Sequence, residues 1–234
     1  PGRPIYALQP PGLDAEATTS IEAMARRSLS LLREIQPSGP YLLGGWSAGG
    51  VVAFEMALQL QDGGERTALL ALVDSRAPSG EPAPPPDELS LLGAFGLSLG
   101  LPWQHITLDP ERLGQLHGRA LLAYALDQAR RAPGATPTQE LDLDEAERAL
   151  AVFKRQIETL HQYRPRRYAG PAALFTATEL LGEATAGGDL GWSRWISGPL
   201  AIHPAPGDHF TLLRAPHAAV LAGLLARHLD HLET

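Results

Sequence analysis

A serine stands between two glycines in the pentapeptide Gly-Trp-Ser-Ala-Gly at 45–49. A short apolar run at 41–43 precedes it, and an apolar, helix-like run at 51–58 follows it. This order of strand, turn and helix is typical of the nucleophile elbow of serine hydrolases, which exposes the serine hydroxyl on a sharp turn. The turn crowds the positions two before and two after the serine, so we expect both glycines there because a larger side chain would clash. Ser47 is the candidate nucleophile.

A serine hydroxyl is a weak nucleophile at neutral pH, so it needs a histidine that takes its proton and an acid that orients this histidine. The histidine comes last in the chain order of these hydrolases. His209 fits this order, since it lies on a loop after a predicted strand at 200–203 and before a helix-like segment. The other histidines that we considered fall on the solvated face of a terminal helix, on a strand, or in a predicted insert: His228 and His231, His203, and His105, His117 and His161.

Three carboxylates compete for the role of the acid. Asp74 follows the clearest buried-strand pattern of the chain, at 68–73, and catalytic groups of parallel sheets gather at the carboxyl ends of the strands. Glu179 and Asp189 follow the next predicted strand, at 172–177, which is another common place for the acid. Periodicity alone does not decide between these positions.

Strand-like and helix-like runs alternate over the first third of the chain. A strand is predicted at 5–8, a helix from about Thr19 to about Gln36 with a capping-box spacing at its start, and then the strands and helix around Ser47. This alternation predicts an α/β fold with a mostly parallel sheet flanked by helices and joined by right-handed crossovers.

The alternation stops at Pro78. A proline-rich connector follows, and then two helix-like segments at about 111–131 and 144–161, before the chain returns to the sheet near Tyr168. We interpret the insertion at about 78–168 as a helical lid over the strand ends. A small packing domain without a role in access is the alternative.

Composition fits this frame. The chain has 234 residues, of which 44% are hydrophobic, and a formal charge of −7, so we expect a single domain over 1–234 and neither nucleic acid nor a membrane as a partner. Cysteine is absent, which excludes thiolate metal sites and suits a reducing, cytoplasmic location. The histidines and carboxylates show no metal-ligand spacing, and we expect no metal and no diffusible cofactor.

Four segments together resemble the thioesterase domains that end nonribosomal peptide synthetases and polyketide synthases. They are the stretch 41–60 around Ser47, the strand 69–74, Tyr-Arg-Pro at 163–165 and Pro-Gly-Asp-His-Phe at 206–210. The resemblance implies an α/β-hydrolase fold with a helical lid. In this family the acid follows the strand immediately after the elbow helix, which favours Asp74 over Glu179 and Asp189.

The resemblance also implies a reaction. The enzyme would release a finished peptidyl or polyketidyl chain from the phosphopantetheine arm of an upstream carrier domain, by hydrolysis or by macrocyclisation. The arm would be a substrate handle that belongs to the carrier. Alternatives are a free-standing editing thioesterase, a small-molecule esterase with the same three residues, and a non-catalytic hydrolase-like binding module.

An oxyanion hole needs two amides, and the backbone amide of Ala48 is the candidate for the first. In the resembling family the second donor lies on a loop before the strand that matches 5–8. We therefore expect an N-terminal strand and loop upstream of Pro1. The turn at 10–13 is the alternative donor, although its two prolines have no amide hydrogen.

Overall fold

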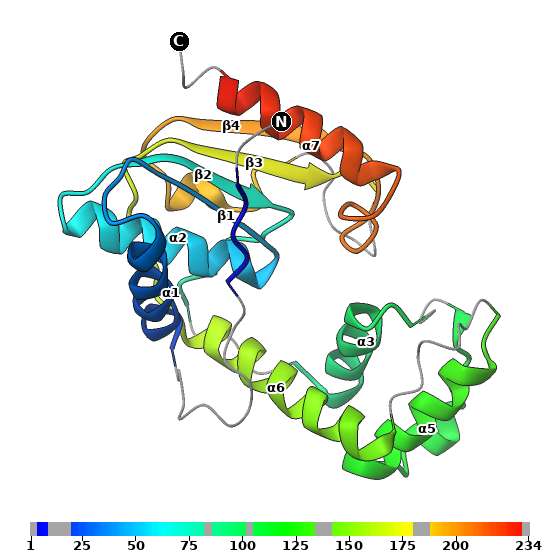
Figure 1. The fold of residues 1–234 in the computed structure, drawn as a ribbon. Coiled ribbons are helices and arrows are strands. Elements are labelled where there is room, and N and C mark those ends of the chain that lie inside the picture. The colour runs from blue at the N-terminus through cyan, green and yellow to red at the C-terminus, as the bar shows by residue number, and fades with distance from the viewer. Residues whose placement is uncertain are drawn as a thin grey trace. The chain divides into compact units, whose positions relative to one another are not determined.

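The computed structural model describes residues 4–8, 20–81, 86–101, 105–133, 142–179 and 188–230. Its centre is a four-stranded sheet in the order β1-β2-β3-β4, in which every pair of neighbours is parallel (Figure 1). The strands are β1 (Tyr41–Trp46), β2 (Thr67–Val73), β3 (Ala172–Ala177) and β4 (Leu200–Ala205). The predicted α/β fold with a parallel sheet is confirmed.

The register of the strands brings their carboxyl ends to one edge of the sheet. Trp46, the last residue of β1, pairs with Val73, the last residue of β2. Val73 in turn pairs with Phe175 near the end of β3. The residues that follow β1 and β2, which are Ser47 and Asp74, therefore leave the sheet side by side.

Helices cover both faces of the sheet (Figure 1). Leu70, Leu72 and Leu174 point to one face, where they pack in one core with α1 (Ile21–Ile35) and α2 (Ala48–Asp62). Their neighbours along the strands point to the opposite face and pack with α7 (His217–Asp230): Leu69, Ala71, Ala173 and Phe175. The alternation of side chains along a strand explains this division.

The first helix begins one residue later than the sequence suggests. Ser20 is its N-cap, and the Ser20 hydroxyl oxygen accepts a hydrogen bond from the backbone amide of Ala23 at 3.2 Å. This bond satisfies one of the amides that a helix start leaves without a partner. Thr19 lies outside the described residues.

The strand predicted at 5–8 is wrong for this structure. Residues 4–8 have no regular secondary structure, and the side chain of Ile5 is 91% exposed. An extended segment becomes a strand only when a neighbour pairs with it, and within the described part of the chain β1 pairs with β2 alone.

The chain divides into two compact units. The sheet unit comprises residues 1–82 and 159–234, and the helical unit comprises 83–158. The helical unit contains α3 (Glu88–Ser98), α4 (Pro110–Leu113), α5 (Gly118–Arg131) and most of α6 (Leu143–Gln162). It has an apolar core of its own, largely leucine and alanine. No helix within the described ranges has the length and apolarity to span a membrane.

Two features of the helical unit differ from the prediction. The helix expected at 111–131 is split into α4 and α5, because Gly114 caps α4 and an extended residue, His117, precedes α5. Helix α3 was not predicted. Its N-cap is Asp87, whose carboxylate accepts from the backbone amide of Ser90 at 2.9 Å.

Candidate active site

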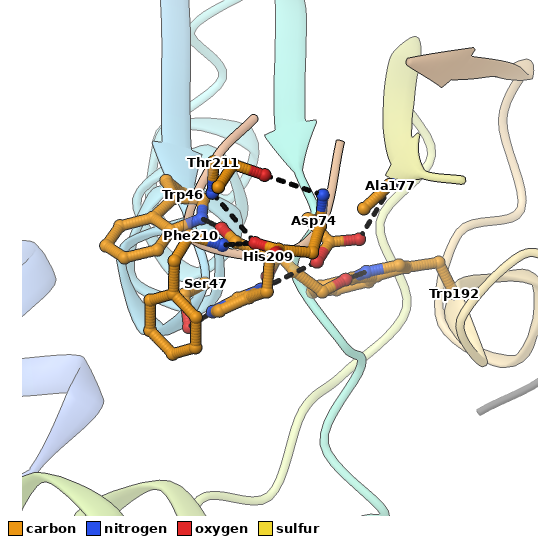
Figure 2. A network of polar contacts seen from close by, with 10 residues as sticks. Trp46, Ser47, Asp74, Ala177, Trp192, His209, Phe210 and Thr211 are labelled. Carbon is orange, nitrogen blue, oxygen red and sulfur yellow. Dashed lines mark hydrogen bonds and ion pairs between the residues drawn. The ribbon is translucent and has the colours of Figure 1, made fainter. Parts of the chain in front are cut away.

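The structure brings Ser47, His209 and Asp74 together at the carboxyl edge of the sheet (Figure 2). His209 Nε2 lies 3.1 Å from Ser47 Oγ, and His209 Nδ1 lies 2.6 Å from Asp74 Oδ2. The three side chains come from the turn after β1, the turn after β2 and the loop between β4 and α7. A base in contact with a hydroxyl, and oriented by an acid, is the arrangement that activates a serine nucleophile.

The turn at Ser47 is strained. Ser47 has φ 54° and ψ −126°, a conformation that costs a residue with a side chain about 1–3 kcal/mol. A Cβ atom on Gly45 would lie 2.1 Å from the carbonyl oxygen of Gly49, so only glycine fits at position 45. The expectation for Gly49 is wrong: among the described atoms, a Cβ there would meet nothing within 4 Å.

The second indispensable glycine is Gly50. A Cβ on Gly50 would lie 2.4 Å from Ser75 Oγ and 2.5 Å from Ser75 Cβ. Ser75 is completely buried and directly follows Asp74. The first turn of α2, which follows the serine, is therefore packed against the segment that carries the carboxylate.

Three hydrogen bonds hold the carboxylate of Asp74 and the residue after it. Its Oδ1 accepts the backbone amide of Ala177 at 3.0 Å, while its Oδ2 faces His209. The indole of the buried Trp192 donates to the carbonyl oxygen of Ser75 at 2.6 Å, which fixes the next peptide (Figure 2). Burial opposes ionisation of Asp74, but the hydrogen bonds from His209 and Ala177 and the charge of Arg76 outweigh it and lower the pKa of Asp74.

The loop that carries His209 is ordered by Asp208. The Asp208 carboxylate accepts the backbone amides of Phe210 and Thr211, each at 2.8 Å. The backbone amide of Asp208 donates to Thr211 Oγ1 at 2.9 Å. Burial of Asp208 raises its pKa, but the bonds from Thr211 and Phe210 outweigh this effect and leave the pKa below its usual value. His209 thus sits in a tight turn whose backbone is fixed by its neighbour.

Trp46 also contacts His209. The indole Nε1 donates to the carbonyl oxygen of His209 at 3.0 Å. The indole and imidazole rings lie 4.9 Å apart between centroids, with 30° between their planes (Figure 2). The residue before the serine therefore packs on the histidine that faces the serine.

The two competing carboxylates lie elsewhere. Asp189 caps the short 3₁₀ helix Trp192–Arg194: its carboxylate accepts the backbone amides of Gly191 and Ser193, each at 3.0 Å, and the Ser193 hydroxyl. Glu179 is exposed in the turn after β3. Neither of them is bonded to His209, whose Nδ1 is paired with Asp74.

The other histidines have different surroundings or lie outside the described residues. His203 on β4 stacks on Phe175, and His228 on α7 lies edge-on to His203, half-buried rather than on a solvated face. The three histidines of the predicted insert are exposed or half-buried: His105, His117 and His161. His231 is not described.

The backbone amide of Ala48 opens α2, where a helix leaves its first amides without an intrahelical partner. An anionic oxygen above Ser47 would meet this amide and the positive end of the helix dipole. The alternative donor turn at 10–13 lies outside the described residues. No group of three or more metal-ligating side chains occurs in the part of the chain that is described.

Sequence reasoning missed the supporting residues: Trp46, Gly50, Ser75, Trp192 and Asp208. Trp46, Gly50 and Asp208 were visible as immediate neighbours of the elbow or of His209. Trp192 carried no signal, since its contact with Ser75 spans 117 positions. Tyr163, from the Tyr-Arg-Pro segment of the resemblance, donates to the buried Glu55 at 2.5 Å within the sheet unit.

Comparison with known proteins confirms the family that the sequence resembles. A family model of the thioesterase domain matches residues 2–229. Chondramide synthase of Chondromyces crocatus is 30% identical over 98% of this chain, and the non-reducing polyketide synthase crz7 of Cladonia metacorallifera is 32% identical over 97% of it. The match covers only 6% and 11% of these two relatives, so the chain spans a small part of their length.

Similarity to solved structures supports the same family. A four-domain nonribosomal peptide synthetase bound to AMP and glycine superposes with a TM-score of 0.75 and 26% identity, over 92% of this chain and 16% of that protein. The NocB thioesterase domain, in covalent complex with a fluorophosphonate nocardicin G analogue, superposes with a TM-score of 0.62 and 25% identity, over 92% of this chain and 77% of that domain. With its parallel sheet and its strained serine turn, the chain belongs to the thioesterase-domain family of nonribosomal peptide and polyketide synthases and has the α/β-hydrolase fold.

Proposed function

We propose that this thioesterase releases a peptidyl or polyketidyl chain from the phosphopantetheine thioester of a carrier domain, through an acyl-Ser47 intermediate. The observation that supports this most strongly is the continuous contact from Ser47 Oγ through His209 to the ionised Asp74. Ser47, His209 and Asp74 would be the catalytic residues.

In the first half of the proposed reaction, Ser47 Oγ attacks the thioester carbonyl and His209 Nε2 takes the hydroxyl proton. Asp74 stabilises the imidazolium that forms and holds its Nδ1 proton. The carbon–sulfur bond then breaks, and His209 returns the proton to the leaving thiolate of the arm. The products are the free thiol and an ester on Ser47.

The second half repeats these steps with a new nucleophile. A water molecule, or a hydroxyl or amine of the acyl chain itself, gives its proton to His209 and attacks the ester. Ser47 leaves with the proton from His209, and a carboxylic acid or a macrocycle departs. In both halves the amide of Ala48 and the start of α2 stabilise the oxyanion.

We further propose that the helical unit is the lid predicted for 78–168. Its insertion directly after the segment of Asp74 and its separate apolar core support this role. A unit with its own core can open and close without disturbing the sheet.

The carrier domain and its arm would be the partners, the site would need no diffusible cofactor, and the enzyme would act in the cytoplasm. The match to a four-domain nonribosomal peptide synthetase, of which this chain covers 16%, supports a carrier in the same polypeptide.

The test is covalent labelling together with turnover. A fluorophosphonate should add one mass to Ser47, and the enzyme should hydrolyse or cyclise members of a panel of acyl-N-acetylcysteamine thioesters. Ser47→Ala should lose both activities, with a fall in kcat of about 10⁶. Ser38→Ala, at an exposed serine, should change neither. Wild-type turnover in Ser47→Ala would refute the proposal, and the masses of the products distinguish hydrolysis from cyclisation.

A further inference from the structure

The imidazole of His209 lies between two aromatic side chains. The indole of Trp46 faces it at 4.9 Å with a tilt of 30°, and Phe210 stands perpendicular to it at 4.9 Å. Trp46 and Phe210 also contact each other edge to face, at 6.1 Å. The three rings form one cluster at the end of β1 (Figure 2).

Three charged groups among the described residues act on His209 or on its partner Asp74. Asp74 is bonded to Nδ1, the charge of Arg76 helps to lower the pKa of Asp74, and the Asp208 carboxylate lies on the same loop as His209. Asp74 meets the imidazole at Nδ1, whereas Trp46 stacks on its ring. The face of an indole carries partial negative charge and attracts a cation placed over it.

The structure assigns to Trp46 the role of a positioning residue for His209. Its N–H holds the His209 backbone through the bond of 3.0 Å, and its ring stabilises the imidazolium that exists while the proton is in transit. This inference rests on the proposed function of His209 as the base. The strand that delivers the nucleophile thereby also fixes the base.

The two contributions can be separated by substitution. Trp46→Phe keeps an aromatic face over the imidazole and removes the N–H donor. Trp46→Leu removes both. Loss of the hydrogen bond should lower kcat about three- to tenfold. Loss of the aromatic face should move the acid limb of the kcat profile to lower pH, because the imidazolium loses a favourable contact.

Trp195 provides a matched control. Its indole Nε1 donates to the carbonyl oxygen of Pro78 at 2.9 Å, and its side chain is partly buried in the same unit. Trp195→Phe therefore removes a hydrogen bond of the same kind without touching His209. A general effect of losing an indole donor would appear equally in Trp195→Phe and Trp46→Phe.

The experiment measures kcat and KM over pH for the wild type, the two Trp46 variants and Trp195→Phe. We expect Trp46→Leu to move the acid limb of the kcat profile to lower pH, and Trp46→Phe to move it less. In the Trp46 variants kcat should fall more than KM changes. Trp195→Phe should keep the wild-type profile.

An acid limb of the kcat profile that stays at the wild-type pH in folded Trp46→Leu would overturn the inference. If Trp46→Leu does not fold, a kcat of Trp46→Phe equal to that of Trp195→Phe would overturn it instead. Failure of the proposed function has a different signature, because Ser47→Ala would then retain turnover whatever the Trp46 variants do.

Discussion

The sheet unit and the helical unit differ in which residues have a strained backbone. Among the described residues, the three with a side chain and a positive φ are Ser47, Asp74 and Leu190, and all belong to the sheet unit. In the helical unit positive φ occurs at Gly100 and Gly118, where it costs little. Two of these three residues, Ser47 and Asp74, carry side chains that meet His209.

Their interiors differ in the same way. The buried polar residues of the described chain lie in the sheet unit: Glu55, Thr67, Ser75, Thr159 and Thr176. The core of the helical unit is apolar, and ion pairs such as Arg119 with Asp144 and Glu147 join α5 and α6 at the surface. Apolar cores tolerate repacking, whereas a buried bonded pair such as Glu55 with Tyr163 in the sheet unit fixes one arrangement. The sheet unit therefore holds its side chains in fixed positions, whereas the core of the helical unit can repack.

The largest expected difference concerns carboxylates. Asp74→Asn should lower kcat about 10⁴-fold, because an amide favours the wrong tautomer of His209 and does not stabilise its charged form. Asp109→Asn, at the exposed N-cap of α4 in the helical unit, should leave kcat within about twofold of wild type. Steady-state kinetics on one thioester measures both variants.

Asp189→Asn tests the assignment of the acid within the sheet unit. Asp189 caps a 3₁₀ helix, so its loss should weaken folding much more than it slows turnover. A larger loss of kcat in Asp189→Asn than in Asp74→Asn would contradict the assignment of the acid.

A smaller difference is expected for glycines. Gly50→Ala should destabilise the protein by about 1–3 kcal/mol, because its Cβ would overlap with the buried Ser75. Gly114→Ala, at the end of α4, has φ −69° and no atom nearer than 3.8 Å to its Cβ. We expect Gly114→Ala to change the denaturation midpoint little. Equal destabilisation in urea titrations would remove the contrast between the two units.

Hydrogen exchange should reveal the smallest difference. Amides of α5 should exchange faster than those of β2, because β2 is paired on both sides and its residues are largely buried. Exchange in α5 as slow as at residues 69–73 would be incompatible with a mobile lid. Mass spectrometry of peptic fragments measures both segments in one experiment.

The sheet and the site geometry were predictable where the signal is local. The elbow needs a strand, a serine turn and a helix within about twenty positions, and all three are legible between Tyr41 and Asp62. The choice of Asp74 needed the family resemblance, because strand patterns alone allow an acid after β2 or β3. That Ser47, Asp74 and His209 are catalytic stays a prediction until the variants are measured.

Other features depend on partners that periodicity does not show. Residues 4–8 have the apolar pattern of a strand but pair with no described strand. Helix α3 was hidden by the prolines before it, although Asp87 and Ser90 form a capping pair. The clash that requires a glycine was placed at Gly49 rather than at Gly50, because only the fold reveals Ser75 beside α2.

The contact between Gly50 and Ser75 has a consequence for how such enzymes diversify. It packs the segment of the nucleophile against the segment of the acid, so a substitution in one segment changes the packing of the other. An alanine at position 50 would be accommodated best together with a glycine at position 75, because the Ser75 Cβ is part of the clash. Loops and helices that do not take part in this contact can change one residue at a time. Substrate preference can therefore evolve while the positions of Ser47 and Asp74 are conserved.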